Sequence, residues 1–332
     1  MMMRVSPAAL IACACILMPC ASWGQMFDSF GRLEKLSGDR QVVVGPFMTP
    51  KASISVQVLD LNGVAMADFP LFISPSSVMH PCPWLMDEFG YFGFNADRHW
   101  WTCMPSGSGV YGTRSDGSGV AVKNANDFSS PPSSFLMGAI ADLPPNVLRE
   151  DYARRQFFTI VRAESVPPGI PSVVVEYFHE TFRHYFNTVL QAEIDGLDRG
   201  VFPGWTRSVG GFIAWATAAD APPGAVPVCR FFSSKFTSHF YTADAIECDE
   251  VVERFGDDWQ LETREAYYIY RPDKSTGACL EGTMPVYRVY AGATRTPNHR
   301  YVTDRGLRDT MVSQGWIAEG YGLDAVIMCT PR

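Results

Sequence analysis

The sequence predicts an all-β sandwich followed by an α+β module of three repeats, each built as strand, strand, helix and strand. Short strands separated by turn signals fill residues 33–163, and one aromatic-rich pattern occurs three times after residue 170. The hydrophobic content of 47% and the charged content of 19% are those of a folded globular chain. The net charge of −8 argues against a nucleic-acid partner, which would need a basic surface.

The N-terminal residues predict an export signal. Arg4 provides a positive n-region, and residues 8–18 form an apolar stretch that is too short to span a bilayer. Ser22 and Gly24 lie three and one positions before a cleavage site, so residues 1–24 are predicted to be a signal peptide. No later segment offers the roughly 18 uninterrupted apolar residues of a transmembrane helix. We therefore expect a secreted, periplasmic or cell-surface protein.

Cleavage near Gly24 leaves an even number of cysteines. The alternative is a lipid anchor on Cys20, although the residues before it form a poor lipidation signal. In an oxidising compartment, six remaining cysteines predict disulfides, whose pairing the sequence alone does not fix. Two pairs suit the repeat plan, Cys229–Cys248 and Cys279–Cys329, and a Cys82–Cys103 pair would close a long loop of the first domain.

The first domain is predicted from strand and turn signals. Residues 52–58 alternate between apolar and polar side chains, which indicates a strand with one buried face. Asn62-Gly63 then gives a strong tight-turn signal. Several short strands at this spacing are typical of a sandwich or barrel. The other predicted strands are 70–73, 111–114, 119–122 and 157–161.

Four stretches of this region carry a family resemblance: LEKLSGDRQVVVG, SVQVLDLNGVAMADFPLFI, RSDGSGVAV and FFTIVRA. In their order, and in their Asp-x-Asn-Gly and Asp-Gly-x-Gly turns, they resemble a bacterial immunoglobulin-like domain of the invasin and intimin type. The resemblance implies that residues 25–165 form an immunoglobulin-like sandwich. It also implies a rigid spacer or adhesion module without catalysis.

An aromatic-rich insert at residues 78–104 departs from that pattern. Two histidines and two cysteines could bind zinc, but their spacing matches no common zinc site, so a disulfide that closes the loop is favoured. These residues are His80, Cys82, His99 and Cys103. The insert also holds three tryptophans, which form either a contact patch or a small core under the loop. They are Trp84, Trp100 and Trp101.

The second domain, predicted at residues 170–332 after Pro167-Pro168, contains an internal repeat. Each copy has an aromatic-rich strand, a polar turn, a histidine, further aromatics and a threonine. The histidines are His184, His239 and His299, in repeats at about 172–220, 226–275 and 284–330.

Each copy continues in the same way after its threonine. An apolar stripe with helical spacing follows, and threonine suits the N-cap of such a helix. We therefore expect Thr188, Thr242 and Thr303 to cap three short helices. A tryptophan and a final strand follow each helix, and these tryptophans are Trp205, Trp259 and Trp316.

The second copy contains His239-Phe240-Tyr241-Thr242 without interruption. In this motif, residues 170–331 resemble a tandem repeat of secreted bacterial and fungal proteins whose function is unknown. The resemblance implies a compact module with pseudo-threefold symmetry. It supplies no activity and no site residue.

The repeated histidines have two interpretations. A residue present in every copy is more often structural than catalytic, so we expect each histidine to bond backbone with a ring nitrogen. The alternative is a pocket in each unit, lined by His239, Tyr241, Trp259 and their counterparts, because aromatics beside polar groups suit sugars or peptides. The full set of candidate ligand-binding residues is His184, His239, His299, Tyr241, Tyr301, Trp205, Trp259, Trp316, Trp84, Trp100 and Trp101.

No catalytic motif stands out. The chain has no Gly-x-Ser-x-Gly elbow and no phosphate loop, and the segment from His179 to His184 does not have zincin spacing. The sequence therefore predicts a non-catalytic binding or adhesion protein without a cofactor or metal, whose partner is a glycan or a cell-surface protein. The alternatives are a secreted hydrolase of polysaccharide or peptide, and a purely structural surface module that presents the 78–104 insert.

Overall fold

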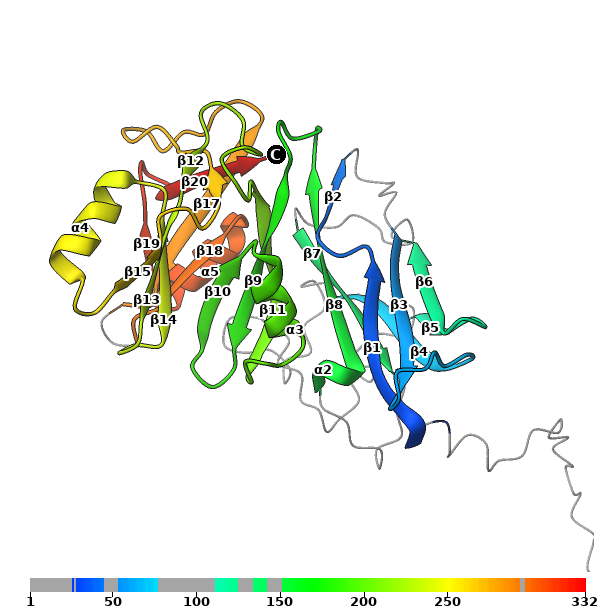
Figure 1. Ribbon diagram of the computed structural model, residues 1–332. Helices are drawn as coiled ribbons and strands as arrows, with labels where there is room; N and C mark the ends of the chain where they lie inside the picture. Colours follow the sequence, from blue (N-terminus) through cyan, green and yellow to red (C-terminus); the bar gives the residue numbers. More distant parts are fainter. Residues whose placement is uncertain are drawn as a thin grey trace, which may run out of the picture.

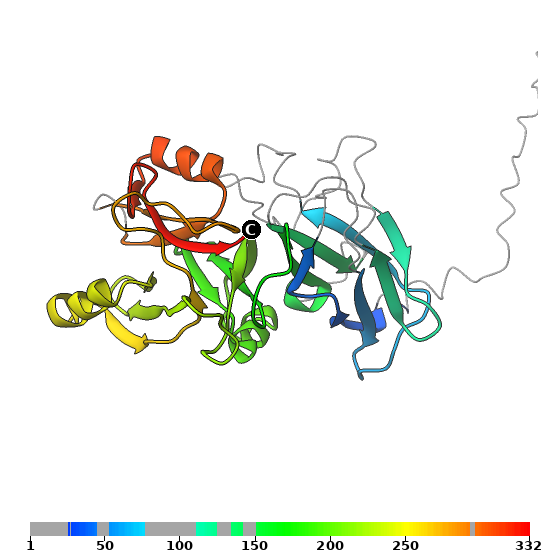
Figure 2. The same ribbon diagram turned by 90° about the horizontal axis from the view of Figure 1, so that it is seen from above.

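The computed structural model describes residues 26, 28–44, 53–76, 111–124, 134–141, 151–292 and 296–332. β-strands are the main secondary structure of these residues, and they form several small open sheets (Figure 1). Two lobes lie side by side, with the blue and cyan strands in one and the yellow, orange and red elements in the other (Figures 1 and 2). The predicted β-rich fold is therefore confirmed. None of the described helices is both long and apolar enough to cross a lipid bilayer.

The first lobe consists of two sheets that share one hydrophobic core. Their strand orders are β1-β3-β6 and β2-β8-β7-β4-β5, and β2 runs parallel to β8. Phe30 and Val56 of the smaller sheet meet Ile73 and Phe158 of the larger sheet in the core. The elements are β1 (Phe30–Ser37), β2 (Gln41–Val44), β3 (Ser53–Asp60), β4 (Pro70–Ser76), β5 (Tyr111–Arg114), β6 (Val120–Asn124), β7 (Ser134–Ala141), the short helix α2 (Asp151–Arg154) and β8 (Arg155–Ala163).

The predicted tight turns of this lobe are formed. The Asp60 carboxylate accepts hydrogen bonds from the backbone N–H groups of Asn62 at 2.8 Å and Val64 at 2.7 Å. Gly63 has a φ of 80°, which glycine adopts without steric cost. Asp116 accepts two equivalent bonds in its own Asp-Gly-x-Gly turn. In both turns, an aspartate side chain fixes the backbone locally.

The second lobe contains three sheets with the same internal order, β10-β9-β11, β14-β13-β15 and β18-β17-β19. The first strand is central in each sheet, and a helix connects the second strand to the third. A last strand, β20, pairs with β17, and β12 pairs with β16. The elements are β9 (Ser172–His179), β10 (His184–Thr188), α3 (Gln191–Asp198), β11 (Trp205–Ala214), β12 (Val226–Pro227), β13 (Cys229–Ser233), β14 (Ser238–Thr242), α4 (Ala245–Phe255), β15 (Gln260–Thr263), β16 (Tyr268–Ile269), β17 (Thr283–Tyr290), β18 (His299–Val302), α5 (Arg305–Ser313), β19 (Ile317–Glu319) and β20 (Val326–Pro331).

Buried tyrosines connect the second strands of these sheets. The Tyr241 hydroxyl donates to the carbonyl oxygen of Asn187 at 2.7 Å and accepts from its N–H at 3.1 Å. The Tyr301 hydroxyl forms the same two bonds with the backbone of Tyr241, at 2.7 and 2.8 Å. Figure 2 shows the green, yellow and orange-red groups placed around a common centre. The predicted ligand residues Tyr241 and Tyr301 therefore belong to the core.

The prediction that threonines cap the helices is wrong. Asp244 is the N-cap of α4 and Asp304 is the N-cap of α5, each through its carboxylate, whereas α3 follows Leu190 without a side-chain cap. Strand pairing extends through Thr188 and Thr242, so each helix starts only after two further residues. The two threonine hydroxyls instead accept bonds from the N–H group two positions later, which fixes the turn into the helix.

Both disulfides predicted for the second lobe are present. Cys229 of β13 is bonded to Cys248 of α4, and Cys279 is bonded to Cys329 of β20. The predicted signal peptide, the predicted Cys82–Cys103 pair and the tryptophans Trp84, Trp100 and Trp101 lie outside the described residues.

Candidate functional site

Strand register shows that the three repeated histidines are not all counterparts. His239 lies opposite Phe232, and His299 lies opposite Tyr290. Two residues after each histidine comes a tyrosine, and this tyrosine lies opposite the arginine of the central strand. In the first sheet, the position of these histidines is occupied by Tyr185, which lies opposite Phe178. The sequence alignment centred on His184 was therefore shifted by one residue relative to the strand pairing.

His184 has the structural role that the sequence predicted. Its Nδ1 donates to the carbonyl oxygen of Thr237, 2.8 Å away in the next sheet. Asn298 precedes β18 and has the position in its sheet that His184 has in the first. It donates to the carbonyl oxygen of Arg183 at 2.7 Å. These two contacts connect neighbouring hairpins, so His184 holds sheets together.

Contrary to prediction, His239 and His299 form no hydrogen bond to backbone within the part of the chain that the structure describes. Their Nε2 atoms lie 3.5 Å from carboxylate oxygens of Glu262 and Glu319, and among the described residues their buried Nδ1 atoms have no hydrogen-bond partner. Their rings pack against aromatic side chains of the preceding sheet. For His239 this neighbour is Phe186, at 4.6 Å between ring centroids.

The predicted pocket around His239 is not assembled, because Trp259 contacts the histidine of the next sheet instead. The Trp259 ring lies 6.0 Å from that of His299, and it also packs on Phe240. Trp316 is buried and contacts Tyr185 in the same manner. These tryptophans therefore fill the spaces between sheets.

Burial keeps His239 neutral. Desolvation, followed by the nearby Arg230 guanidinium, lowers the pKa of His239 to about 3. Its contact with Glu262 is therefore not an ion pair at neutral pH. Desolvation also lowers the pKa of His299.

The lowered pKa of His239 predicts that the folded protein loses stability in acid. The unfolded chain binds a proton at His239 below its ordinary pKa of about 6.5, whereas the folded chain does not. The contribution of His239 is therefore fully present above about pH 6.5 and falls by about 1.4 kcal/mol per pH unit below it. We expect urea titrations at pH 7, 6, 5 and 4 to show a shallower pH dependence for His239→Gln than for the unmodified protein. Equal slopes of stability against pH would contradict the assignment of His239 as neutral in the folded protein.

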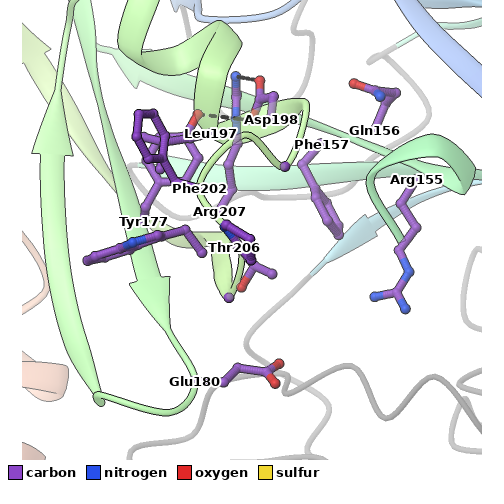
Figure 3. A pocket seen from close by; sticks show the side chains of 14 residues that line it. Arg155, Gln156, Phe157, Tyr177, Glu180, Leu197, Asp198, Phe202, Thr206 and Arg207 are labelled. Atoms are coloured by element: carbon purple, nitrogen blue, oxygen red, sulfur yellow. Dashed lines mark hydrogen bonds and ion pairs between the residues drawn. The ribbon is translucent and has the colours of Figure 1, made fainter. Parts of the chain in front are cut away.

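A cavity of about 280 Å³ lies where β8 of the first lobe meets the first sheet of the second lobe (Figure 3). We call it the junction pocket. Strand β8 contributes one side, and α3, β11 and the loop between them contribute the other. Its lining comprises Arg155, Gln156, Phe157, Tyr177, Glu180, Leu197, Asp198, Gly200, Phe202, Pro203, Gly204, Trp205, Thr206 and Arg207.

The loop at residues 199–204 forms one wall of the junction pocket. Gly200 and Gly204 have φ values of 71° and 87°, and a Cβ on Gly204 would lie 2.5 Å from Nε2 of His179. Glycine is therefore required at this bend. The corresponding connections in the other sheets are the shorter segments 256–259 and 314–316. The longer loop places Phe202 in the pocket wall.

Two of the lining residues, Asp198 and Arg207, belong to a group of four charged side chains that we call the junction ion network, completed by Lys35 and Asp39. Arg207 Nη1 and Nη2 lie 2.6 Å from Asp39 and 2.7 Å from Asp198. Lys35 Nζ lies 3.0 Å from Asp39 and 2.6 Å from Asp198. The hydroxyl of Tyr177 also donates to Asp198, at 2.9 Å. Two cations and two anions are thus mutually paired across the two lobes.

Mutual attraction keeps this network charged. Burial by itself would raise the pKa of Asp39 and Asp198, but Arg207 and then Lys35 outweigh it and hold both pKa values below their usual range. At neutral pH, both carboxylates are therefore ionised and committed to their cations. Neither is suited to proton transfer, which needs a pKa near the working pH.

Of the predicted ligand residues within the described chain, Trp205 alone lines the junction pocket. Sequence reasoning missed Phe157, Phe202 and Arg155, because they reach the pocket only through contact between the lobes. The one available signal was the longer 199–204 connection, found in the first copy only. Within the described residues, no three His, Cys, Asp or Glu side chains are placed to hold a metal ion.

A domain family of unknown function, DUF5648, matches residues 173–326, which include all three sheets of the second lobe. Over this segment, the chain is similar to a family without an assigned activity or ligand. No curated protein and no solved structure matches the chain.

Proposed function

We propose that this chain is an exported, non-catalytic binding protein of the extracellular space, periplasm or cell surface, whose ligand occupies the junction pocket. The observation that carries the proposal is an aromatic-lined cavity whose charged lining residues Asp198 and Arg207 are already paired within the junction ion network. Such a site combines apolar contact surface with a few polar groups at its edge, which is typical of ligand pockets. A glycan or other cell-surface material is the proposed ligand.

The proposal includes the architecture. The first lobe is taken as an immunoglobulin-like sandwich, and the second as three repeats around a pseudo-threefold axis. In support, a buried or partly buried ion pair spans each boundary between the three sheets. These pairs are Glu193–Arg230, Glu247–Arg288 and Glu176–Arg300. Each arginine also stacks on an aromatic ring of the neighbouring sheet: Phe186, Phe240 and Tyr185, respectively.

The arrangement supports binding more than hydrolysis. A glycosidase of the usual kind needs two carboxyl groups that face each other across the scissile bond. The pocket lining contains Asp198 and Glu180, but Asp198 is held by Lys35 and Arg207. A pair of Asp198 and Glu180 would therefore need a carboxylate that two cations already engage.

Phe202→Ala tests the binding site, with Phe255→Ala as its matched control. Phe202 is 53% exposed and lines the pocket, whereas Phe255 is 55% exposed and lies on α4. We expect Phe202→Ala to weaken binding to a glycan array or to purified cell wall about tenfold, the effect of losing one aromatic contact. Phe255→Ala should bind like the unmodified protein. Equal effects of the two substitutions, or no binding by the unmodified protein, would refute the proposed site.

A further inference from the structure

We infer that the junction pocket takes the uncharged terminal ring of a sugar chain, with the apolar face of the ring against an aromatic side chain. This inference rests on the proposed function and adds the class of ligand. It follows from the size of the pocket, from the side chains of its walls and from the charge of its lining.

The size of the pocket limits the ligand to one or two rings. Its volume of about 280 Å³ lies just below the range for small-molecule sites, roughly 300–1,000 Å³. The pocket lies where β8 meets the α3–β11 loop and is lined from both lobes (Figure 3). A space of this size takes the end of a sugar chain more readily than a long internal segment.

The walls offer aromatic surface that is held in place. The indole of Trp205 makes edge contacts with His179 at 5.1 Å and with Phe186 at 6.0 Å, and it remains partly exposed. Phe202 packs over Gly196 of α3, where a Cβ would lie only 3.1 Å from the ring. Rings fixed in this way lose little conformational freedom when a flat apolar surface stacks on them.

The lining has no net charge to complement a charged ligand. Arg155 and Arg207 are balanced by Glu180 and Asp198. In Figure 3, Asp198 lies at the top, Arg155 at the right and Glu180 at the bottom, so charges of both signs are distributed around the site. A ligand of either sign would therefore meet a like charge in the pocket. An uncharged ring with hydroxyl groups would meet polar side chains such as Thr206 at its rim and aromatic rings at its face.

The test is saturation-transfer NMR and calorimetry on the mature full chain with small probes. The probes are the methyl glycosides of glucose, galactose, mannose and N-acetylglucosamine, the methyl glycoside of glucuronic acid, and a neutral tripeptide. We expect at least one uncharged glycoside to bind about tenfold or more tightly than the uronic acid, which corresponds to about 1.4 kcal/mol. Trp205→Ala and Phe202→Ala should each abolish the transfer signal, whereas Phe255→Ala should retain it.

The outcomes separate the inference from the proposed function. Binding of only the uronic acid or the tripeptide, lost in Phe202→Ala, would overturn the uncharged-sugar inference and leave the binding site standing. Sugar binding that survives both pocket substitutions would overturn the location as well. An absence of binding to all probes, together with cell-wall binding that Phe202→Ala abolishes, would overturn only the ligand class.

Discussion

Replacing Glu176 by leucine is expected to lower the free energy of unfolding by about 3–5 kcal/mol, because it leaves the charge of Arg300 buried without its partner. The side chains of Glu176 and Arg300 are 1% and 0% exposed, and their oxygen and nitrogen atoms lie 2.8 Å apart. Arg300 Nε forms a second bond to Glu176 at 3.0 Å. Urea denaturation monitored by circular dichroism would measure the loss.

A double-mutant cycle separates the pair from its surroundings. Because well-packed apolar residues often replace a buried ion pair at little cost, Glu176→Leu combined with Arg300→Met should recover most of the stability lost by either single variant. The exposed pair Arg305–Asp324, at 61% and 44% exposure, provides the control. Arg305→Met should cost less than about 0.5 kcal/mol. Losses that simply add in the double variant would contradict the assigned pairing.

The Glu176–Arg300 pair could not be predicted by comparing the three similar segments of the sequence. At the other two boundaries, the acid lies on a helix, in Glu193 and Glu247, and the arginine lies on the next central strand. At the third boundary, the acid lies on the central strand β9 and the arginine on β18. Glu176 thus takes the central-strand position that Arg230 and Arg288 have in the other sheets, and its cation comes from a strand instead of a helix, so aligning the three segments does not reveal the pair.

The tight turns and both disulfides of the second lobe were predicted, whereas the contacts between the two lobes were not. The turn at Asp60 needs only residues within four positions, and the Cys229–Cys248 bond lies within one copy of the repeat. The junction pocket instead depends on Lys35 and Asp39 meeting Asp198 and Arg207, which are far away in the sequence. No local pattern distinguishes these residues from ordinary surface charges.

The prediction of the helix caps was wrong for a related reason. Threonine is a good N-cap by itself, but Thr242 is the last residue of a strand whose pairing with Cys229 keeps it extended. Two residues later, Asp244 is the first acceptor that reaches the open end of the helix. Pairing within the sheet therefore decided which of two suitable residues became the cap.

Arg207→Met is expected to destabilise the protein by about 3–5 kcal/mol as well, because it leaves Asp39 and Asp198 with Lys35 as their remaining cation in the network. The side chain of Arg207 is 0% exposed. The same variant removes a guanidinium from the lining of the junction pocket, so ligand binding should fall with stability. The free energy of unfolding at pH 7 is the measurement.

A control at the same boundary is provided by Arg40, which donates to Gln191 on the surface of the junction. Arg40→Met should cost less than about 0.5 kcal/mol, because exposed contacts contribute little. The cost of Arg207→Met should also depend on pH. Because the pKa values of Asp39 and Asp198 are lowered in the folded chain, their contribution is fully present above about pH 4 and is lost as pH falls further.

The pH profile distinguishes electrostatics from packing. If Arg207 stabilises the junction through its charge, the difference between Arg207→Met and the unmodified protein will shrink from pH 4 to pH 3, where unfolded carboxylates become protonated. If the side chain mainly fills space beneath Tyr177, whose ring lies 5.9 Å from the guanidinium, the difference will stay constant over that range. A constant difference would refute the ion network as the contact that holds the two lobes, and with them the two sides of the pocket, in place.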